Sequence, residues 1–108
     1  MKNTNEIQRR WVNNFDEIIN LISLGVGVGE SLVTAVLEDM RAMSQYEECT
    51  VTKDEIVETE RRILSVQLQE ESLESLEFWF TLLKQKVKIS DLAISSEYLI
   101  STTTRLTI

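Results

Sequence analysis

The apolar residues of this chain recur mainly at spacings of three, four and seven, the period of one face of an α-helix. The first such pattern covers about residues 4–24, with Asn3 placed to cap it and Glu6 in its first turn. Its apolar positions are Ile7, Trp11, Phe15, Ile18, Ile19 and Ile22. A second pattern covers about residues 30–47, with apolar positions at Leu32, Val33, Val36, Leu37, Met40, Met43 and Tyr46. Both patterns predict amphipathic helices.

The longest helical pattern runs over 53–87, a stretch that contains neither glycine nor proline. Thr52 and Glu55 have the spacing of a capping box, in which each side chain binds a free backbone N–H. Lysines gather at the other end, where the helix dipole favours cations. The apolar positions of the stretch are Ile56, Ile63, Val66, Leu73, Leu76, Phe80, Leu83 and Val87. We therefore predict one long helix over 53–87 as the backbone of the fold.

A helix over 53–87 would be roughly 52 Å long, whereas a compact domain of this size has a diameter of roughly 34 Å. Either the helix bends or breaks near Gln69–Ser72, or a second copy of the chain covers its overhang. The aromatic run Phe78-Trp79-Phe80 favours the second option, because three consecutive residues spread over about 200° of a helix surface. The alternative is that the whole run lies in the core of one chain. The predicted partner or dimer interface consists of Leu76, Phe78, Trp79, Phe80, Leu83 and Val87.

The remaining segments complete an all-α bundle of three to four helices in one domain, residues 1–108. The last part divides into a short helix at about 91–100 and a tail at 101–108, whose β-branched residues suit a strand or an ordered tail.

The glycines lie together in Leu-Gly-Val-Gly-Val-Gly-Glu, residues 24–30. A dinucleotide loop needs the spacing G-x-G-x-x-G after a strand, and neither condition is met here. We expect a connector in which Gly25 ends the first helix. The alternative is that Gly25 and Gly29 stay helical and allow two helices to cross closely.

Composition limits the chemistry. The chain has no histidine and a single cysteine, Cys49, so the usual catalytic triads, histidine-based metal sites and an internal disulfide are excluded. The acidic residues Glu70, Glu74 and Glu77 are expected to lie on one helix face, and we interpret them as a solvated rim. We therefore expect neither an enzyme nor a cofactor or metal site. The absence of a long uncharged stretch argues against membrane insertion, and the lone cysteine favours the cytoplasm.

The net charge of −7 argues against nucleic-acid and anionic-membrane partners. The best-supported function is a helical protein–protein interaction module, such as an adaptor, chaperone or inhibitor. We expect it to be a dimer and to offer an apolar, acid-rimmed surface to a basic amphipathic segment. Two alternatives stay open. One is a DNA-binding regulator, because residues 88–106 loosely resemble a helix-turn-helix. The other is an acidic inhibitor that mimics nucleic acid.

Overall fold

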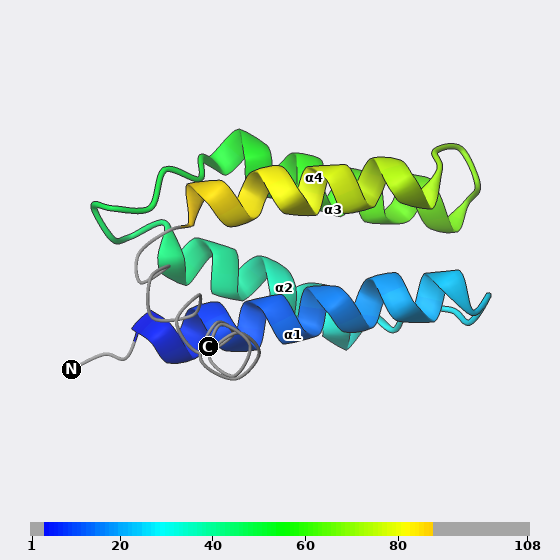
Figure 1. Cartoon of the computed structure of the whole chain (residues 1–108), viewed down its shortest axis with the longest axis horizontal. Coiled ribbons are helices and arrows are strands. Elements are labelled where there is room, and N and C mark those ends of the chain that lie inside the picture. The colour runs from blue at the N-terminus through cyan, green and yellow to red at the C-terminus, as the bar shows by residue number, and fades with distance from the viewer. Residues whose placement is uncertain (1–3, 88–108) are drawn as a thin grey trace, which may run out of the picture.

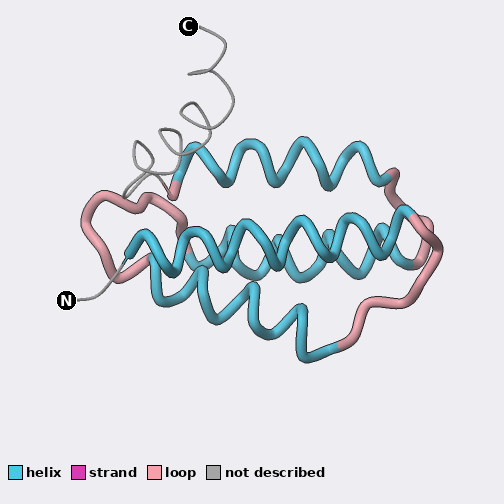
Figure 2. The backbone as a smooth tube through the Cα atoms, turned by 60° about the horizontal axis from the view of Figure 1, so that its bottom comes forward, coloured by secondary structure: helices cyan, strands magenta, loops and turns pink. Residues whose placement is uncertain are grey.

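Four α-helices form an antiparallel bundle in the computed structural model, which describes residues 4–87. The helices are α1 (Thr4–Ser23), α2 (Glu30–Met43), α3 (Lys53–Gln67) and α4 (Leu73–Lys86). Successive helices run in opposite directions (Figure 1). The last helix, α4, closes the bundle by packing on both α3 and α1. The three connecting segments lie at the two ends of the bundle (Figure 2). The all-α prediction is therefore confirmed, and residues 4–87 contain no strand.

The first helix closely follows its predicted range and ends at the glycine expected to end it. Gly25 has a φ of 76°. The N–H of Gly25 donates to the Ile22 carbonyl at 3.0 Å, and the N–H of Val26 donates to the Leu21 carbonyl at 2.9 Å. These two bonds form a Schellman motif, which requires the left-handed conformation that glycine adopts readily. Gly29 is the extended N-cap of α2, so the alternative of two helical glycines is wrong. The predicted cap residue Asn3 lies outside the described residues.

The second helix is shorter than the predicted range 30–47. It ends at Met43, and residues 44–48 form turns. The N–H groups of Gln45 and Tyr46 bond to carbonyls three residues earlier, and the Ser44 hydroxyl donates to the Arg41 carbonyl. The chain therefore leaves the α-helix through tighter turns instead of continuing to residue 47.

The predicted long helix over 53–87 is wrong, because the chain breaks into α3 and α4. The break falls in the segment named as the alternative, near Gln69–Ser72. Gln69 has a φ of 64°. Its N–H donates to the Val66 carbonyl at 3.0 Å, and the N–H of Glu70 donates to the Ser65 carbonyl at 2.8 Å. This is a second Schellman motif, with glutamine in the place that glycine usually takes.

A new helix, α4, begins after this break and has its own N-terminal cap. The side chain of Ser72 accepts from the N–H of Ser75 at 3.2 Å and caps α4. At the start of α3, the capping box of Thr52 and Glu55 is present as predicted, with bonds of 2.9 and 3.1 Å. The predicted helix at 91–100 and the predicted tail at 101–108 lie outside the described residues, as does Lys88, one of the lysines expected near the end of the long helix.

The core lies along the axis of the bundle and includes a cluster of aromatic rings. Phe80 stacks on Phe15 with 4.1 Å between ring centroids, and Trp11 packs edge-on against both. Every apolar position predicted for 53–87 faces this core, and each is buried except Leu73, which is partly buried. Among residues 4–87, the buried apolar side chains of this core are Trp11, Phe15, Ile18, Val36, Leu37, Met40, Met43, Cys49, Val51, Ile56, Ile63, Val66, Leu76, Phe80, Leu83 and Val87.

Polar contacts set how the helices pair. Arg10 of α1 donates two hydrogen bonds to the buried carboxylate of Asp39 in α2, at 2.8 and 3.0 Å. At the same end, Lys86 of α4 pairs with Glu55 of α3 at 2.9 Å. Hydrogen bonds between charged groups are directional. These pairs therefore define the relative position of neighbouring helices more specifically than apolar contacts alone would.

Candidate functional site

The three consecutive aromatic residues of α4 point in three different directions. Each residue of an α-helix is rotated by about 100° from the one before it. Phe80 points into the core, where it stacks on Phe15. The ammonium of Lys84 lies 4.4 Å from the centre of the Phe80 ring. Phe80 therefore belongs to the core of the bundle.

Trp79 lies between α4 and α3. Its indole Nε1–H donates to the hydroxyl of Thr59 at 2.9 Å. The guanidinium of Arg62 lies over the ring, 4.6 Å from its centre, an arrangement typical of a cation–π contact. Trp79 is therefore partly buried by α3, and its polar atom is already paired within the chain.

Phe78 points away from the bundle. Its exposed fraction is 65%, and Leu82, one turn further along α4, is 37% exposed. We call these two side chains the α4 patch. A phenylalanine this exposed contributes little to the core, so its large apolar surface is free to contact another molecule.

The structure divides the predicted interface into two parts. Leu76, Phe80, Leu83 and Val87 are buried in the core of the chain, so they are not available to a partner. The prediction of partner contact stays a prediction for Phe78 and for the exposed part of Trp79. Leu82 was missed, although its spacing of four from Phe78 places both residues on the same side of a helix.

The acidic rim is also divided by the helix break. Glu74 and Glu77 are exposed on α4, four residues and one residue before Phe78. The prediction that Glu70 lies on the same helix face as Glu74 and Glu77 is wrong, because Glu70 lies in the turn before α4. Glu71, in the same turn, lies 3.9 Å from both Arg61 and Arg62. Glu74 and Glu77 are therefore the acidic residues beside the α4 patch.

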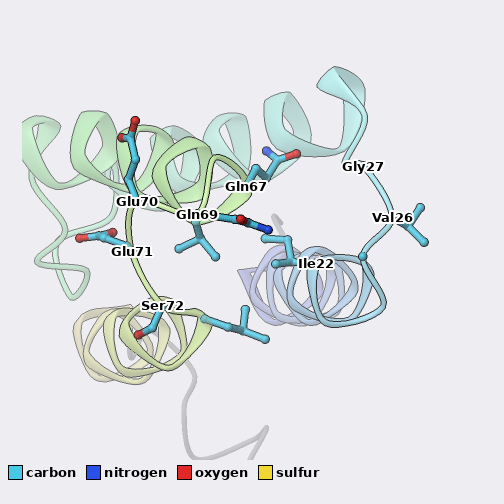
Figure 3. A pocket seen from close by; sticks show the side chains of 11 residues that line it. Ile22, Val26, Gly27, Gln67, Gln69, Glu70, Glu71 and Ser72 are labelled. Atoms are coloured by element: carbon cyan, nitrogen blue, oxygen red, sulfur yellow. The ribbon is translucent and has the colours of Figure 1, made fainter.

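An open cavity of about 620 Å³ lies at the end of the bundle, between the α1–α2 connector and the α3–α4 turn (Figure 3). Gln69 extends across it toward Ile22, whereas the carboxylates of Glu70 and Glu71 point away from it. Its walls carry amides, glycines, apolar side chains and the Ser72 hydroxyl, and the two acidic residues of its lining do not direct their carboxylates into it. The lining residues are Ile22, Gly25, Val26, Gly27, Val66, Gln67, Gln69, Glu70, Glu71, Ser72 and Leu73.

We looked in residues 4–87 for a reactive cysteine, a metal site and a membrane-spanning helix. Cys49 is buried, and burial raises the pKa of its thiol, which lowers the fraction of the nucleophilic thiolate. Among residues 4–87, no cluster of acidic or cysteine side chains has the arrangement of a metal site. In the same range, none of the helices combines the length and hydropathy needed to cross a membrane.

Comparison of the chain with protein-family models, curated proteins and solved structures finds no match. The helix-turn-helix alternative rests on residues 88–106, which lie outside the described residues. Phe78 and its acidic neighbours Glu74 and Glu77 are therefore the part of the predicted site that the structure leaves exposed.

Proposed function

We propose that this protein is a non-enzymatic interaction module that holds a basic amphipathic helix of another protein against the outer face of α4. A single observation carries the proposal. Phe78 is 65% exposed in the middle of α4, whereas its neighbours Trp79 and Phe80 are held by contacts within the chain. Large exposed aromatic residues are frequent anchors of protein interfaces.

The surroundings of the α4 patch favour a basic partner. Glu74 lies one turn before Phe78 on the same side of α4, and the exposed Glu77 directly precedes Phe78. The lysines of α4 are engaged elsewhere, because Lys86 pairs with Glu55 and Lys84 covers Phe80. The net charge of −7 also attracts cationic partners over longer distances. A helix with apolar residues three and four apart and lysines or arginines beside them would match this surface.

Two further expectations, the location and the oligomeric state, come from the sequence. The cytoplasmic location rests on the single cysteine. The homodimer expected from the sequence loses its original basis, since α4 folds back along α3 and leaves no overhang to cover (Figure 1).

The test is the capture of partners from the native host by the tagged full chain, by its Phe78→Ser variant and by a Leu64→Ser control. Leu64 is an apolar residue on α3 that is 54% exposed, compared with 65% for Phe78, so its replacement controls for nonspecific hydrophobic binding. Thermal unfolding should show that both variants stay folded.

We expect Phe78→Ser to lose a partner that wild type and Leu64→Ser both retain. Crosslinks to that partner should fall in a basic amphipathic helix. Capture of the same proteins by all three chains would show that the α4 patch is not the binding surface.

A further inference from the structure

The turn between α3 and α4 is a short segment, residues 68–72, that contains neither glycine nor proline. It reverses the chain at Gln69, whose φ of 64° is a left-handed conformation that residues with a Cβ rarely adopt. Its first four positions hold leucine, glutamine and two glutamates, which are good helix formers. The turn therefore holds the chain in a conformation that its own residues disfavour.

A continuous helix through this turn would remove the strain at Gln69. It would also pair the last carbonyls of α3 and the first N–H groups of α4, which lack partners within a helix that ends there. Val66 and Leu73 lie on either side of the turn, seven residues apart, so they would stay on the same side of a continuous helix. The two helices can therefore join without turning their buried faces to opposite sides.

A chain with α3 and α4 joined has no helix in the place that α4 occupied in its own bundle. In the closed chain, α4 packs on α3 and α1 and buries Leu76, Phe80 and Leu83. A second copy of the chain carries the same helix, with the same side chains for that place. We infer that two copies of this chain exchange their α4 helices, each through one continuous helix that fills the bundle of the other.

The exchange keeps the contacts of α4 and changes only which chain supplies them. The hydrogen bond from Trp79 to Thr59 and the ion pair of Lys86 with Glu55, both at 2.9 Å, would form between the two copies. The loss of free movement on association opposes the exchange, whereas release of the strained turn favours it. Short, strained connections are a known cause of such exchange.

Exposed apolar residues gather at the end of the bundle where two exchanged copies would meet. The α1–α2 connector lies across the open cavity from the α3–α4 turn (Figure 3). Leu24 and Val26 of the connector are 66% and 51% exposed, and Leu68 of the turn is 57% exposed. The twofold axis passes through the middle of the joined helices, so this end of one copy faces the same end of the other. The exchange therefore brings together apolar surface that the closed chain leaves exposed.

Refolding of the full chain from urea tests the inference, because unfolded chains can choose between the closed and the exchanged form. After refolding at about 500 µM, size-exclusion chromatography with light scattering should show a species of twice 12.5 kDa. Conversion between the forms requires release of α4 from the bundle, so this dimer should persist after dilution. Refolding at 500 µM that gives only monomer overturns the inference.

Two variants of Gln69 should change the amount of dimer in opposite directions at equal concentration. Gln69→Gly should lower it at least about fivefold, because glycine relieves the closed turn and weakens the joined helix. Gln69→Val should raise it, because a β-branched residue tolerates a positive φ least. Circular dichroism shows whether each variant is folded, and Gln69→Gly keeps the test decisive if the valine variant is not. An unchanged amount of dimer in Gln69→Gly overturns the inference.

Isotope-filtered NOE spectra of a dimer prepared from labelled and unlabelled chains identify which chain supplies α4. NOEs between Trp79 and Thr59 should connect labelled with unlabelled chains. If they occur only within one chain, the dimer associates through a surface and the inference is wrong. Phe78→Ser should form the same dimer as wild type, because Phe78 lies outside the exchanged contacts. That variant separates this inference from the proposed function.

Discussion

The indole Nε1–H of Trp79 donates a hydrogen bond of 2.9 Å to the hydroxyl of Thr59, across the contact between α4 and α3. That hydroxyl in turn donates to the carbonyl of Glu55 at 2.8 Å. Thr59 is fully buried, so the relay links two helices where water does not reach. Trp79 therefore has a structural role, although the sequence places it in the same aromatic run as the exposed Phe78.

Replacing Thr59 by valine tests this link. We expect Thr59→Val to destabilise the fold by about 1–2 kcal/mol, because the indole N–H loses its acceptor while remaining partly buried. In a Trp79→Phe background the same replacement should cost clearly less, since no N–H is left without a partner. Urea unfolding of the four proteins in this cycle measures the difference. Equal costs in both backgrounds would show that the hydrogen bond contributes nothing.

The helix break shows where sequence periodicity stops being informative. Val66 and Leu73 are seven residues apart, which is also two turns of a continuous helix, so the apolar pattern passes across the turn without a visible interruption. The usual signal of a helix end, glycine or asparagine in the left-handed position, is missing because Gln69 occupies it. The buried face was predictable residue by residue, whereas the reversal of the chain depends on a turn stabilised by the packing of α4 on α3 and α1.

Gln69 and Gly25 both have a positive φ. Variants at these two turn positions test how much this backbone conformation costs a residue that has a Cβ. Gln69→Gly should stabilise the fold by about 1 kcal/mol, because glycine adopts a positive φ without steric cost, and its larger unfolded-state entropy offsets part of the gain. Gly25→Ala should destabilise it by about 1–2 kcal/mol. A Cβ at Gly25 would meet no atom within 4 Å, so its cost reports the backbone alone.

Thermal and urea unfolding measure both variants. No gain from Gln69→Gly would indicate that the Gln69 side chain, which extends across the cavity, makes contacts that offset the backbone strain.

The candidate site was predictable only in part. Three consecutive aromatic residues cannot all face one core, so some exposed aromatic surface follows from helix geometry. Which residue is exposed depends on the rotation of α4, which its contacts with α3 and α1 set. The exposed apolar residues Val57 and Leu64 of α3 were missed for a related reason. They directly follow Ile56 and Ile63, which supplied the pattern of the buried face.

The ion pairs around Glu58 predict how stability depends on pH. Glu58 accepts hydrogen bonds from Arg61 at 2.7 and 3.0 Å and from Arg62 at 2.7 Å. The bonds from Arg61, together with the bond from Arg62, lower the pKa of Glu58 from 4.5 to about 2, although partial burial acts in the opposite direction. A carboxylate whose pKa is lower in the folded state stabilises the fold above its unfolded pKa. This contribution is lost as the pH falls from about 4.5 toward 2.

We therefore expect Glu58→Gln to be less stable than wild type by about 1 kcal/mol near pH 7, a value limited by solvent screening of these partly exposed groups. The difference should narrow below about pH 4.5 and nearly vanish at pH 2, because wild-type Glu58 is then increasingly protonated in both states. Urea unfolding followed by circular dichroism between pH 2 and 7 measures it. Glu60→Gln is the control, since Glu60 is an exposed acid on the same helix and accepts none of these bonds. An equal loss in both variants would assign the pH dependence to overall charge and not to the Arg61–Glu58–Arg62 group.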